Sequence, residues 1–414
     1  MQRYDTYKDS GVKWLGEIPE HWEVIKTSHL FTHIGSGTTP KSGSEEYYTE
    51  EGIHFLQTGD LNDGFIVDTS KRITEKALRD TNLTIYPQGS LVIAMYGATI
   101  GKLGILDIDT TVNQACCVLP KSPKIKTRFA FYVYLAAKND LIFQSKGGGQ
   151  PNISQDTIKS ERIPVPSRAE QDAIVTYLDT ATAKIDAAIA QQQKMIDLLN
   201  ERKQIIINKA VTRGLNPNAK MKDSGVEWIG EVPEEWEVMR MRYLCSTTTG
   251  DKDTINRVDD GLYPFYVRSP KVERINTYSY DGEAVLMAGD GVGAGKVFHY
   301  ANGKFGYHQR VYNFYNIKKI KGKLLYYYMQ SLFKYVIEQL SAKSTVDSVR
   351  LNMIQDFIVV IPPDEEQNCL IEYLDNQIKK IDYSIETVEK QISLLQERKQ
   401  IIINEVVTGK VKVV

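Results

Sequence analysis

The sequence predicts an α+β protein with two mixed α/β domains separated by an antiparallel two-helix coiled coil, as a pseudo-twofold tandem duplication. The first observation is a repeat: residues 198–208 return as residues 394–404, with ten of eleven positions identical. A second repeat opens each half, since residues 8–24 match residues 222–238 at 13 of 17 positions. The third observation is that the segments between these repeats, residues 25–162 and 239–358, have diverged in sequence and length. Matching ends with diverged middles indicate one scaffold that carries two readers of different targets.

The two long helices are predicted from a heptad pattern. Read at spacings of four then three, six of nine positions from Leu178 and eight of nine from Leu374 are apolar. A seam of about four heptads is typical of a coiled coil. A helix over residues 170–208 would be about 58 Å long at 1.5 Å per residue. We expect the seam to pair the helices and to contact other subunits through Leu178, Ile185, Ile189, Ile196, Leu199, Ile206, Leu374, Ile381, Ile385, Ile392, Leu395 and Ile402.

The repeats also predict the domain boundaries. The first domain is expected at residues 1–162, the first long helix and linker at 163–221, the second domain at 222–358, and the second helix and tail at 359–414. Short apolar runs bounded by turn residues predict strands at 53–56, 91–95, 116–119, 163–165, 285–288 and 311–315. Tyr, Leu and Phe at helical spacing predict helices at 129–143 and 324–340. Helices that pair along their seams would run antiparallel, with a globular domain at each end.

Composition and charge narrow the class of protein. Hydrophobic residues make up 42% and charged residues 25% of the chain, as in ordinary soluble proteins. No apolar run approaches a membrane span and no signal peptide opens the chain, which predicts a cytoplasmic protein. The four cysteines, without CxxC spacing, fit a reducing compartment. A net charge of −1 argues against strong unaided binding to nucleic acid.

Motifs that would indicate catalysis are incomplete. The glycine-rich residues 289–296 lack the Gly and the Ser or Thr that a phosphate loop needs, and residues 97–102 fail in the same way. We expect instead a tight glycine turn that brings backbone amides and a Lys toward a ligand surface. Glu201 and Glu397 begin ExK motifs, but these lie within the heptad helix, where a solvated face or a subunit contact is the favoured interpretation. The six histidines have no metal-binding spacing, so the sequence predicts no catalytic residue and no metal site.

Contact with nucleic acid is the better supported function. The second middle segment carries 17 Lys and Arg against 11 Asp and Glu, whereas the first carries 15 against 14. Gln, Asn and Arg side chains can pair with base edges in the major groove. The tyrosines at 326–328 are interpreted as helix core. The candidate DNA contacts are Ser36, Thr38, Thr39, Lys41, Gln57, Thr58, Tyr96, Lys102, Asn113, Gln114, Gln150, Thr248, Lys252, Tyr266, Arg268, Lys296, His308, Gln309, Arg310 and Lys343.

The doubled order of these elements resembles the specificity subunit of Type I restriction-modification enzymes. The resemblance rests on the heads WLGEIPEHW and WIGEVPEEW, the loop GSGTTP at residues 35–40, and two copies of EQ, YLD, ID and LLxERKQII in that order. The aligned loop of the second half, residues 245–252, lacks the proline. The motifs span essentially the whole chain.

This resemblance implies a non-catalytic subunit in which each variable domain is a target-recognition domain for one half of a bipartite, asymmetric double-stranded DNA site. The paired helices would set the spacer and bind two modification (methyltransferase) subunits. Two restriction subunits could join the complex. The subunit itself would bind no cofactor; S-adenosylmethionine, ATP and Mg are expected on the partners. Two rival hypotheses remain: an adaptor that binds protein or glycan, and a nuclease that uses the ExK pair.

Overall fold

The computed structural model describes residues 2–144, 152–341 and 348–413 and forms two compact units. Unit 1 comprises Met1–Gln191 and Gln391–Val414, and unit 2 comprises Gln192–Lys390. Each unit therefore holds one globular domain and one part of each long helix. No helix within the described ranges is both long and apolar enough to cross a membrane.

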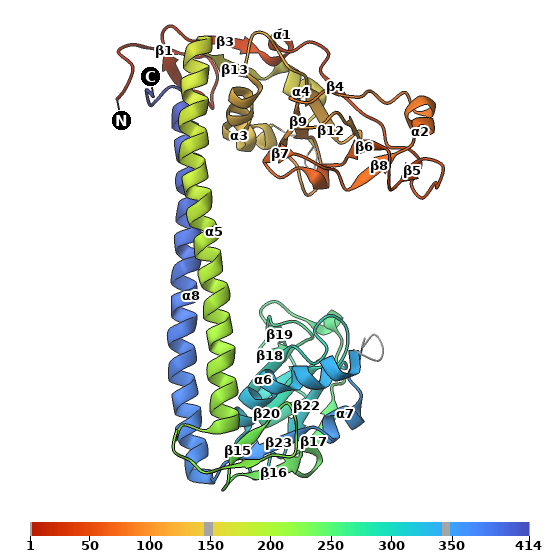
Figure 1. Cartoon of the computed structure of the whole chain (residues 1–414), viewed down its shortest axis with the longest axis vertical. Coiled ribbons are helices and arrows are strands. Elements are labelled where there is room, and N and C mark those ends of the chain that lie inside the picture. Colours follow the sequence, from red (N-terminus) through yellow and green to blue (C-terminus); the bar gives the residue numbers. More distant parts are fainter. Residues whose placement is uncertain (1, 145–151, 342–347, 414) are drawn as a thin grey trace. The chain divides into compact units, whose positions relative to one another are not determined.

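The first domain, the globular part of unit 1, is built on a five-stranded and a four-stranded sheet. In spatial order the first holds β4 (Gly35–Ser36), β12 (Cys116–Leu119), β9 (Leu91–Ala94), β10 (Leu103–Leu106) and β7 (Gly64–Ile66). The second holds β11 (Thr111–Val112), β6 (Ile53–Leu56), β8 (Lys71–Ile73) and β5 (Tyr48–Thr49). Every residue of β9, β10 and β12 is buried. Helix α3 (Thr127–Phe143) packs against β9 and β10 (Figure 1), and the opposite face of the strands lies in a second hydrophobic cluster with Leu56, Leu61 and Ile66.

Short elements complete the first domain. Strands β1 (Tyr7–Asp9) and β2 (Glu17–Pro19) form a hairpin from the repeated head, and β3 (Glu23–Lys26) pairs with β13 (Arg162–Val165). The remaining helices are α1 (Thr27–Leu30), η1 (Thr58–Asp60), α2 (Glu75–Asp80) and α4 (Gln155–Ser160). The β3–β13 pairing brings the chain back beside its own head just before the long helix begins.

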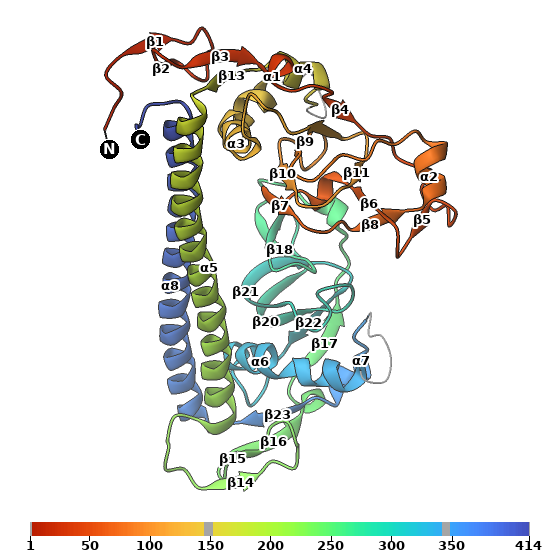
Figure 2. The same ribbon diagram turned by 45° about the horizontal axis from the view of Figure 1, so that its top comes forward.

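The second domain, the globular part of unit 2, has one six-stranded sheet. Its spatial order is β17 (Ser246–Thr249), β22 (Val311–Tyr315), β20 (Tyr280–Ala288), β21 (Phe298–Tyr307), β18 (Tyr263–Tyr266) and β19 (Glu273–Ile275). Helix α6 (Gly322–Ser341) packs against β20 and β21 (Figure 2). The head gives β14 (Met221–Asp223) and β15 (Glu231–Pro233), and β16 (Glu237–Arg240) pairs with β23 (Ile358–Ile361). Helices η2 (Met241–Tyr243), η3 (Thr254–Asn256) and α7 (Leu351–Gln355) complete the domain.

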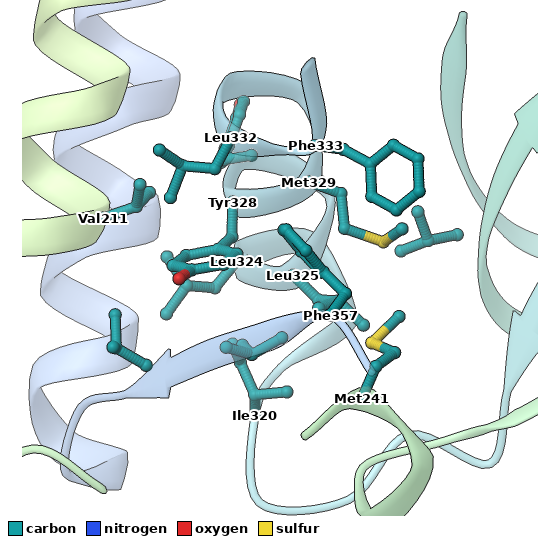
Figure 3. Packing of buried hydrophobic residues seen from close by; sticks show 14 of the residues in the cluster. Val211, Met241, Ile320, Leu324, Leu325, Tyr328, Met329, Leu332, Phe333 and Phe357 are labelled. Carbon is teal, nitrogen blue, oxygen red and sulfur yellow. The ribbon is translucent and has the colours of Figure 1, made fainter. Parts of the chain in front are cut away.

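The cores confirm the predicted strands and helices. Each predicted run lies within or overlaps an observed strand, and 129–143 and 324–340 lie within α3 and α6. Tyr327 and Tyr328 are 6% and 1% exposed, as the helix-core interpretation predicts. Figure 3 shows Val211 of the first long helix facing Tyr328 and Leu332 of α6, within one hydrophobic cluster. The sequence did not predict β21, because its polar centre around residues 302–304 interrupts the apolar pattern.

Both long helices exceed the predicted length. Helix α5 (Arg168–Arg213) has 46 residues and α8 (Asp364–Val407) has 44. A capping box starts α5: Ser167 Oγ accepts the Glu170 amide at 3.3 Å, and Glu170 Oε2 accepts the Ser167 amide at 3.2 Å. At the other end Gly214 has φ +69°, a left-handed conformation that ends a helix readily.

Within each unit the two helices run antiparallel and are joined by the same ion pair. In unit 1, Lys399 Nζ lies 2.7 Å from Asp186 Oδ1, and in unit 2, Lys203 Nζ lies 2.8 Å from Asp382 Oδ1. These residues are copies of one another at the offset of 196. All twelve predicted seam positions are buried or half-buried. Toward the end of each helix, however, Ile207 and Ile403 are more buried than the predicted Ile206 and Ile402, because a globular domain covers a different face there.

Candidate nucleic-acid interface

The loops that carry most of the predicted contacts gather at one end of the strands in each domain. In the first domain they follow β4, β6, β9 and β11. Backbone hydrogen bonds join them: the Asn113 amide donates to Leu56 O at 3.0 Å, and the Met95 amide donates to Ala115 O at 2.8 Å. The Ile153 amide in turn donates to Met95 O at 2.7 Å. We call this set the loop cluster.

The second domain has the same loop cluster, with the same backbone bonds. There the His308 amide donates to Tyr266 O at 2.9 Å and the Gly289 amide to Arg310 O at 2.8 Å. The Val349 amide donates to Gly289 O at 2.7 Å. These bonds align the two clusters residue by residue. Position 58 corresponds to 268, 96 to 290, 114 to 309, and 115 to 310.

Glycine is required at two equivalent positions of this scaffold. A Cβ on Gly37 would lie 1.5 Å from Val112 O, and one on Gly250 would lie 2.1 Å from Tyr307 O. Both contacts are far shorter than any real carbon–oxygen approach, so only glycine lets the first loop pass this close to the end of β11 in one domain and of β21 in the other. The shared glycine therefore fixes the path of the first loop in both domains.

The predicted glycine turns are present in both clusters. Gly97 and Gly101 have φ of +82° and +73°, and Gly291 and Gly295 have φ of +70° and +62°. The Gly101 amide donates to Ala94 O, and the Gly295 amide to Ala288 O, each at 2.9 Å. Positive φ favours glycine, so these four turn positions account for the glycine-rich sequence of both segments, which resembles a phosphate loop without its full motif.

The side chains on this common scaffold differ between the domains. The first domain places Thr58, Tyr96 and Ala115 where the second places Arg268, Asp290 and Arg310. The predicted contacts that the two clusters share are the exposed glutamines Gln114 and Gln309 and the lysines Lys102 and Lys296. Thr39 Oγ1 donates to Gln114 Oε1, whereas Gln309 Nε2 donates to Asp253 Oδ2 at 2.7 Å. Two clusters of the same shape thus present different chemical groups.

Most of the predicted contact residues have solvent access. The exposed ones are Ser36, Thr38, Lys41, Gln114, Thr248, Arg268, Lys296, Gln309 and Arg310, and the half-buried ones are Thr39, Gln57, Thr58, Tyr96, Lys102 and Lys252. Burial raises the pKa of the Tyr96 phenol, which keeps it a neutral hydrogen-bonding group. Gln150 and Lys343 lie outside the described residues.

Three of the predicted contacts are buried in the structure. Asn113 is 9%, Tyr266 9% and His308 3% exposed. Asn113 Oδ1 accepts the Ala115 amide at 3.1 Å, and His308 Nδ1 accepts the Arg310 amide at 2.9 Å. The Tyr266 ring packs on Phe305, with centroids 5.4 Å apart. These side chains support the loops from beneath, since their polar atoms or rings are used within the protein.

The charges around His308 favour its neutral form. Burial lowers the pKa of this imidazole, and the positive charges of Arg268 and Arg310 lower it further, against the opposing effect of Asp253 and Asp290. A neutral ring suits the geometry, because Nδ1 needs a lone pair to accept the Arg310 amide. His308 therefore supports the arginine-bearing turn without adding charge to it.

Asp290 is the residue of the cluster that sequence reasoning missed. Its carboxylate accepts from Arg268 Nη1 at 3.0 Å and lies 3.6 Å from Arg310 Nε. In the sequence, Asp290 stands where a phosphate loop would need a glycine, and nothing there marks it as a contact residue. Its position beside two predicted contact arginines follows from the fold and has no local signal.

The repeated residues of the long helices anchor the domains. In unit 1, Asp179 Oδ1 accepts from Arg128 Nε at 2.7 Å and from the Tyr132 hydroxyl at 2.5 Å. In unit 2, Asp375 accepts from Lys323 Nζ at 2.6 Å and from the Tyr327 hydroxyl at 2.5 Å. The repeat conserves the helical aspartate, and each domain supplies one cation and one tyrosine.

The head tryptophans provide a second anchor. The Trp22 indole donates to Glu170 Oε1 at 3.2 Å, and the Trp236 indole donates to Glu366 Oε2 at 2.8 Å. Both tryptophans are almost fully buried. The two sequence repeats, head and helix, thus meet each other in each unit, which explains why they are retained together.

The ExK motifs do not converge on a metal site. Lys203 and Lys399 are used in the interhelical ion pairs, and Glu201 and Glu397 are exposed on the helix surface. Across the described ranges, no group of three or more His, Cys, Asp or Glu is placed to hold a metal ion. The geometry supports the helix-face interpretation of these motifs.

Comparison with known proteins identifies a family. The model of the Type I restriction modification DNA specificity domain matches residues 19–196 and 233–394. The MjaVIII specificity subunit of a Type I restriction enzyme from Methanocaldococcus jannaschii is 26% identical, covering 98% of this chain and 97% of that protein. The putative MjaX specificity subunit of the same organism is 24% identical, with 98% of both chains covered.

A solved structure shares the fold. A chain studied for complex assembly and conformational transition of the type I R-M system aligns with a TM-score of 0.69 and 15% identity. The alignment covers 95% of this chain and 99% of that chain. The predicted architecture of two mixed α/β domains with long helices is therefore confirmed.

Proposed function

Because the chain belongs to the Type I restriction modification DNA specificity domain family, we propose that it selects the DNA sequence on which a Type I restriction-modification enzyme acts. It catalyses no step itself in this proposal. S-adenosylmethionine, ATP and Mg are used by the partner subunits, and this subunit supplies sequence choice.

Each domain reads one half of a bipartite, asymmetric double-stranded DNA site. The observation that carries this proposal is the pair of loop clusters, which share backbone hydrogen bonds and differ in their exposed side chains. Base edges are distinguished by the donors and acceptors that side chains present to them. Two clusters of equal shape and different chemistry are suited to two different half-sites.

The long helices hold the reading domains and dock the modification subunits. Aspartate and glutamate anchors fix each domain to the helices, so that helix length sets the number of base pairs between the half-sites. The modification subunits bind to apolar residues of the long helices that lie outside the seam and stay exposed. Leu198 and Ile205 in unit 2 are 51% and 58% exposed, and their copies Leu394 and Ile401 in unit 1 are 63% and 48% exposed. One such pair in each unit suits two modification subunits; up to two restriction subunits complete the enzyme.

A domain exchange tests the proposal. The chain is co-expressed with its modification subunit, and the methylated motif is mapped by methylome sequencing. Replacing residues 25–162 with those of a relative should change one half of the motif only, because that segment contains the first loop cluster alone. Replacing residues 239–358 is the matched control and should change the other half. Loss of both halves from either exchange would contradict separate reading.

A further inference from the structure

We propose that Arg268, Asp290 and Arg310 form a guanine-reading element of the second domain, in which Asp290 positions the two arginines. This inference rests on the proposed function. It goes beyond that function by naming a base and the residues that select it.

The carboxylate of Asp290 lies between the two guanidinium groups. Oδ1 accepts from Arg268 Nη1 at 3.0 Å, and Oδ2 lies 3.6 Å from Arg310 Nε. The Asp290 side chain is 24% exposed, against 46% for Arg268 and 64% for Arg310. A partly covered carboxylate thus holds two more exposed arginines toward solvent.

The main chain beneath the element is fixed. The Arg310 amide donates to the buried His308 Nδ1 at 2.9 Å, and Arg310 O accepts the Gly289 amide at 2.8 Å. Asp290 pairs with Ser348 in an isolated β-bridge. Arginine loses much rotamer freedom when it binds, and a side chain held beforehand loses less. The element is therefore organised before DNA arrives.

The contacts with Asp290 leave each arginine a two-donor edge. Arg268 uses Nη1, which leaves Nε and Nη2, and Arg310 faces Asp290 with Nε, which leaves Nη1 and Nη2. Within the described residues no hydrogen bond occupies Nη1 or Nη2 of Arg310. Guanine presents O6 and N7 as a pair of acceptors in the major groove, and bidentate arginine is the commonest contact to it.

The carboxylate also distinguishes base reading from phosphate binding. An aspartate beside both arginines would repel a phosphate, whereas it orients a guanidinium toward the neutral edge of a base. The first domain has Thr58, Tyr96 and Ala115 at the three equivalent positions, so the element belongs to the second domain alone. A guanine read in this way must lie in the half-site that the second domain selects.

The test uses the complex of this chain with its modification subunits. Methylome sequencing of the wild type and of the residue 239–358 exchange assigns one half-site to the second domain, and we expect a fixed guanine there. Binding is then measured on duplexes in which that guanine is replaced by each other base or by 7-deazaguanine, which lacks the N7 acceptor. Arg310→Lys, which keeps the charge and loses the fork, should lower discrimination at that position by about five- to 150-fold, the range for one bidentate pair. Arg268→Lys should act at the same guanine or at a neighbouring one, and Asp290→Asn should lower discrimination less than either.

A matched control comes from the same domain. Arg240 is 55% exposed on β16, outside the loop cluster, and its Nη1 donates to Asp356 Oδ1 at 2.9 Å. Arg240→Lys should leave base discrimination unchanged. A melting curve for each variant shows whether a loss of base discrimination comes from the substituted side chain or from a loss of folded protein.

The outcomes separate the two proposals. A second-domain half-site without a fixed guanine would overturn the guanine reader and leave the specificity function standing. Arg310 and Arg268 variants that weaken binding equally on all sequences would assign the arginines to phosphates and also overturn it. A complex that methylates with no bipartite motif would instead overturn the proposed function. If 7-deazaguanine weakens binding by the wild type and does not weaken binding by Arg310→Lys, the result supports guanine reading by Arg310.

Discussion

At the scale of single residues, the loop clusters combine fixed supports with variable tips. Gly37 and Gly250 let the first loop approach the ends of β11 and β21, and Asn113 and His308 accept an amide two residues ahead. These supports occupy equivalent positions in both domains. The exposed positions above them, such as Thr58 and Arg268, have diverged. In the proposed function, a recognition domain can therefore change its target without changing its scaffold.

His308 provides a prediction on pH. An unperturbed imidazole has a pKa of about 6.5, and the pKa of His308 in the folded protein is lower. Between the two values the unfolded chain binds more protons, so this stability is present above pH ~6.5 and falls as pH drops toward the folded value. The slope is at most about 1.4 kcal/mol per pH unit for one proton. We expect His308→Asn to remove this loss of stability at low pH, because an asparagine does not titrate and Asn113 performs the same acceptor role in the first domain.

The measurement is the free energy of unfolding from pH 5 to 8. His299 also has a lowered pKa from burial, so a part of the pH dependence should remain in the variant. At pH 8 the variant and the wild type should match, which controls for general damage. An unchanged slope in His308→Asn would mean that the imidazole does not carry the effect.

At the scale of elements, each long helix carries two sets of apolar residues, one buried in the seam and one exposed. The seam residues pair the helices, as the buried Ile196 and Ile381 show. Leu198, Ile205 and their copies lie beside the seam and stay exposed, although the repeat keeps their identity. Large apolar side chains that remain exposed on both copies are typical of a protein interface.

We expect these exposed pairs to be the docking points of the modification subunits. The double substitution Leu198→Ser and Ile205→Ser should release one modification subunit, and Leu394→Ser with Ile401→Ser should release the other. Native mass spectrometry of the complex would count them, and the four substitutions together should release both. Leu351→Ser on α7, where Leu351 is 44% exposed, is the control and should leave the complex intact. Full retention of both subunits by all variants would place docking elsewhere.

At the scale of the whole molecule, the helices would act as a ruler in the proposed function. Both interhelical ion pairs, Asp186 with Lys399 and Lys203 with Asp382, fit the same antiparallel register. In each pair the two residue numbers add to the same total, as they must for antiparallel helices in one register. A heptad inserted between residues 191 and 192 and another between 393 and 394 would keep this register and the seam. Seven helical residues add about 10.5 Å, close to the length of three base pairs at about 3.4 Å each.

The doubly lengthened chain should therefore methylate the same half-sites with a spacer about three base pairs longer. Methylome sequencing measures the spacer directly. Insertion into one helix alone is the control, and it should abolish activity because the Lys–Asp pairs lose their register. An unchanged spacer in the double insertion would rule out the helix as the ruler.

Much of this protein was determined by sequence alone. Duplicated heads and heptads predicted the helices, because a long apolar seam is local and periodic, and the apolar runs predicted β6, β9, β12 and β22 for the same reason. The tertiary structure decided which polar residues act together. Asn113, Tyr266 and His308 are buried, and Asp290 lies between Arg268 and Arg310, which are 22 and 20 residues away from it in the chain. Burial and pairing of this kind depend on how strands are ordered in the sheet, which no local pattern encodes.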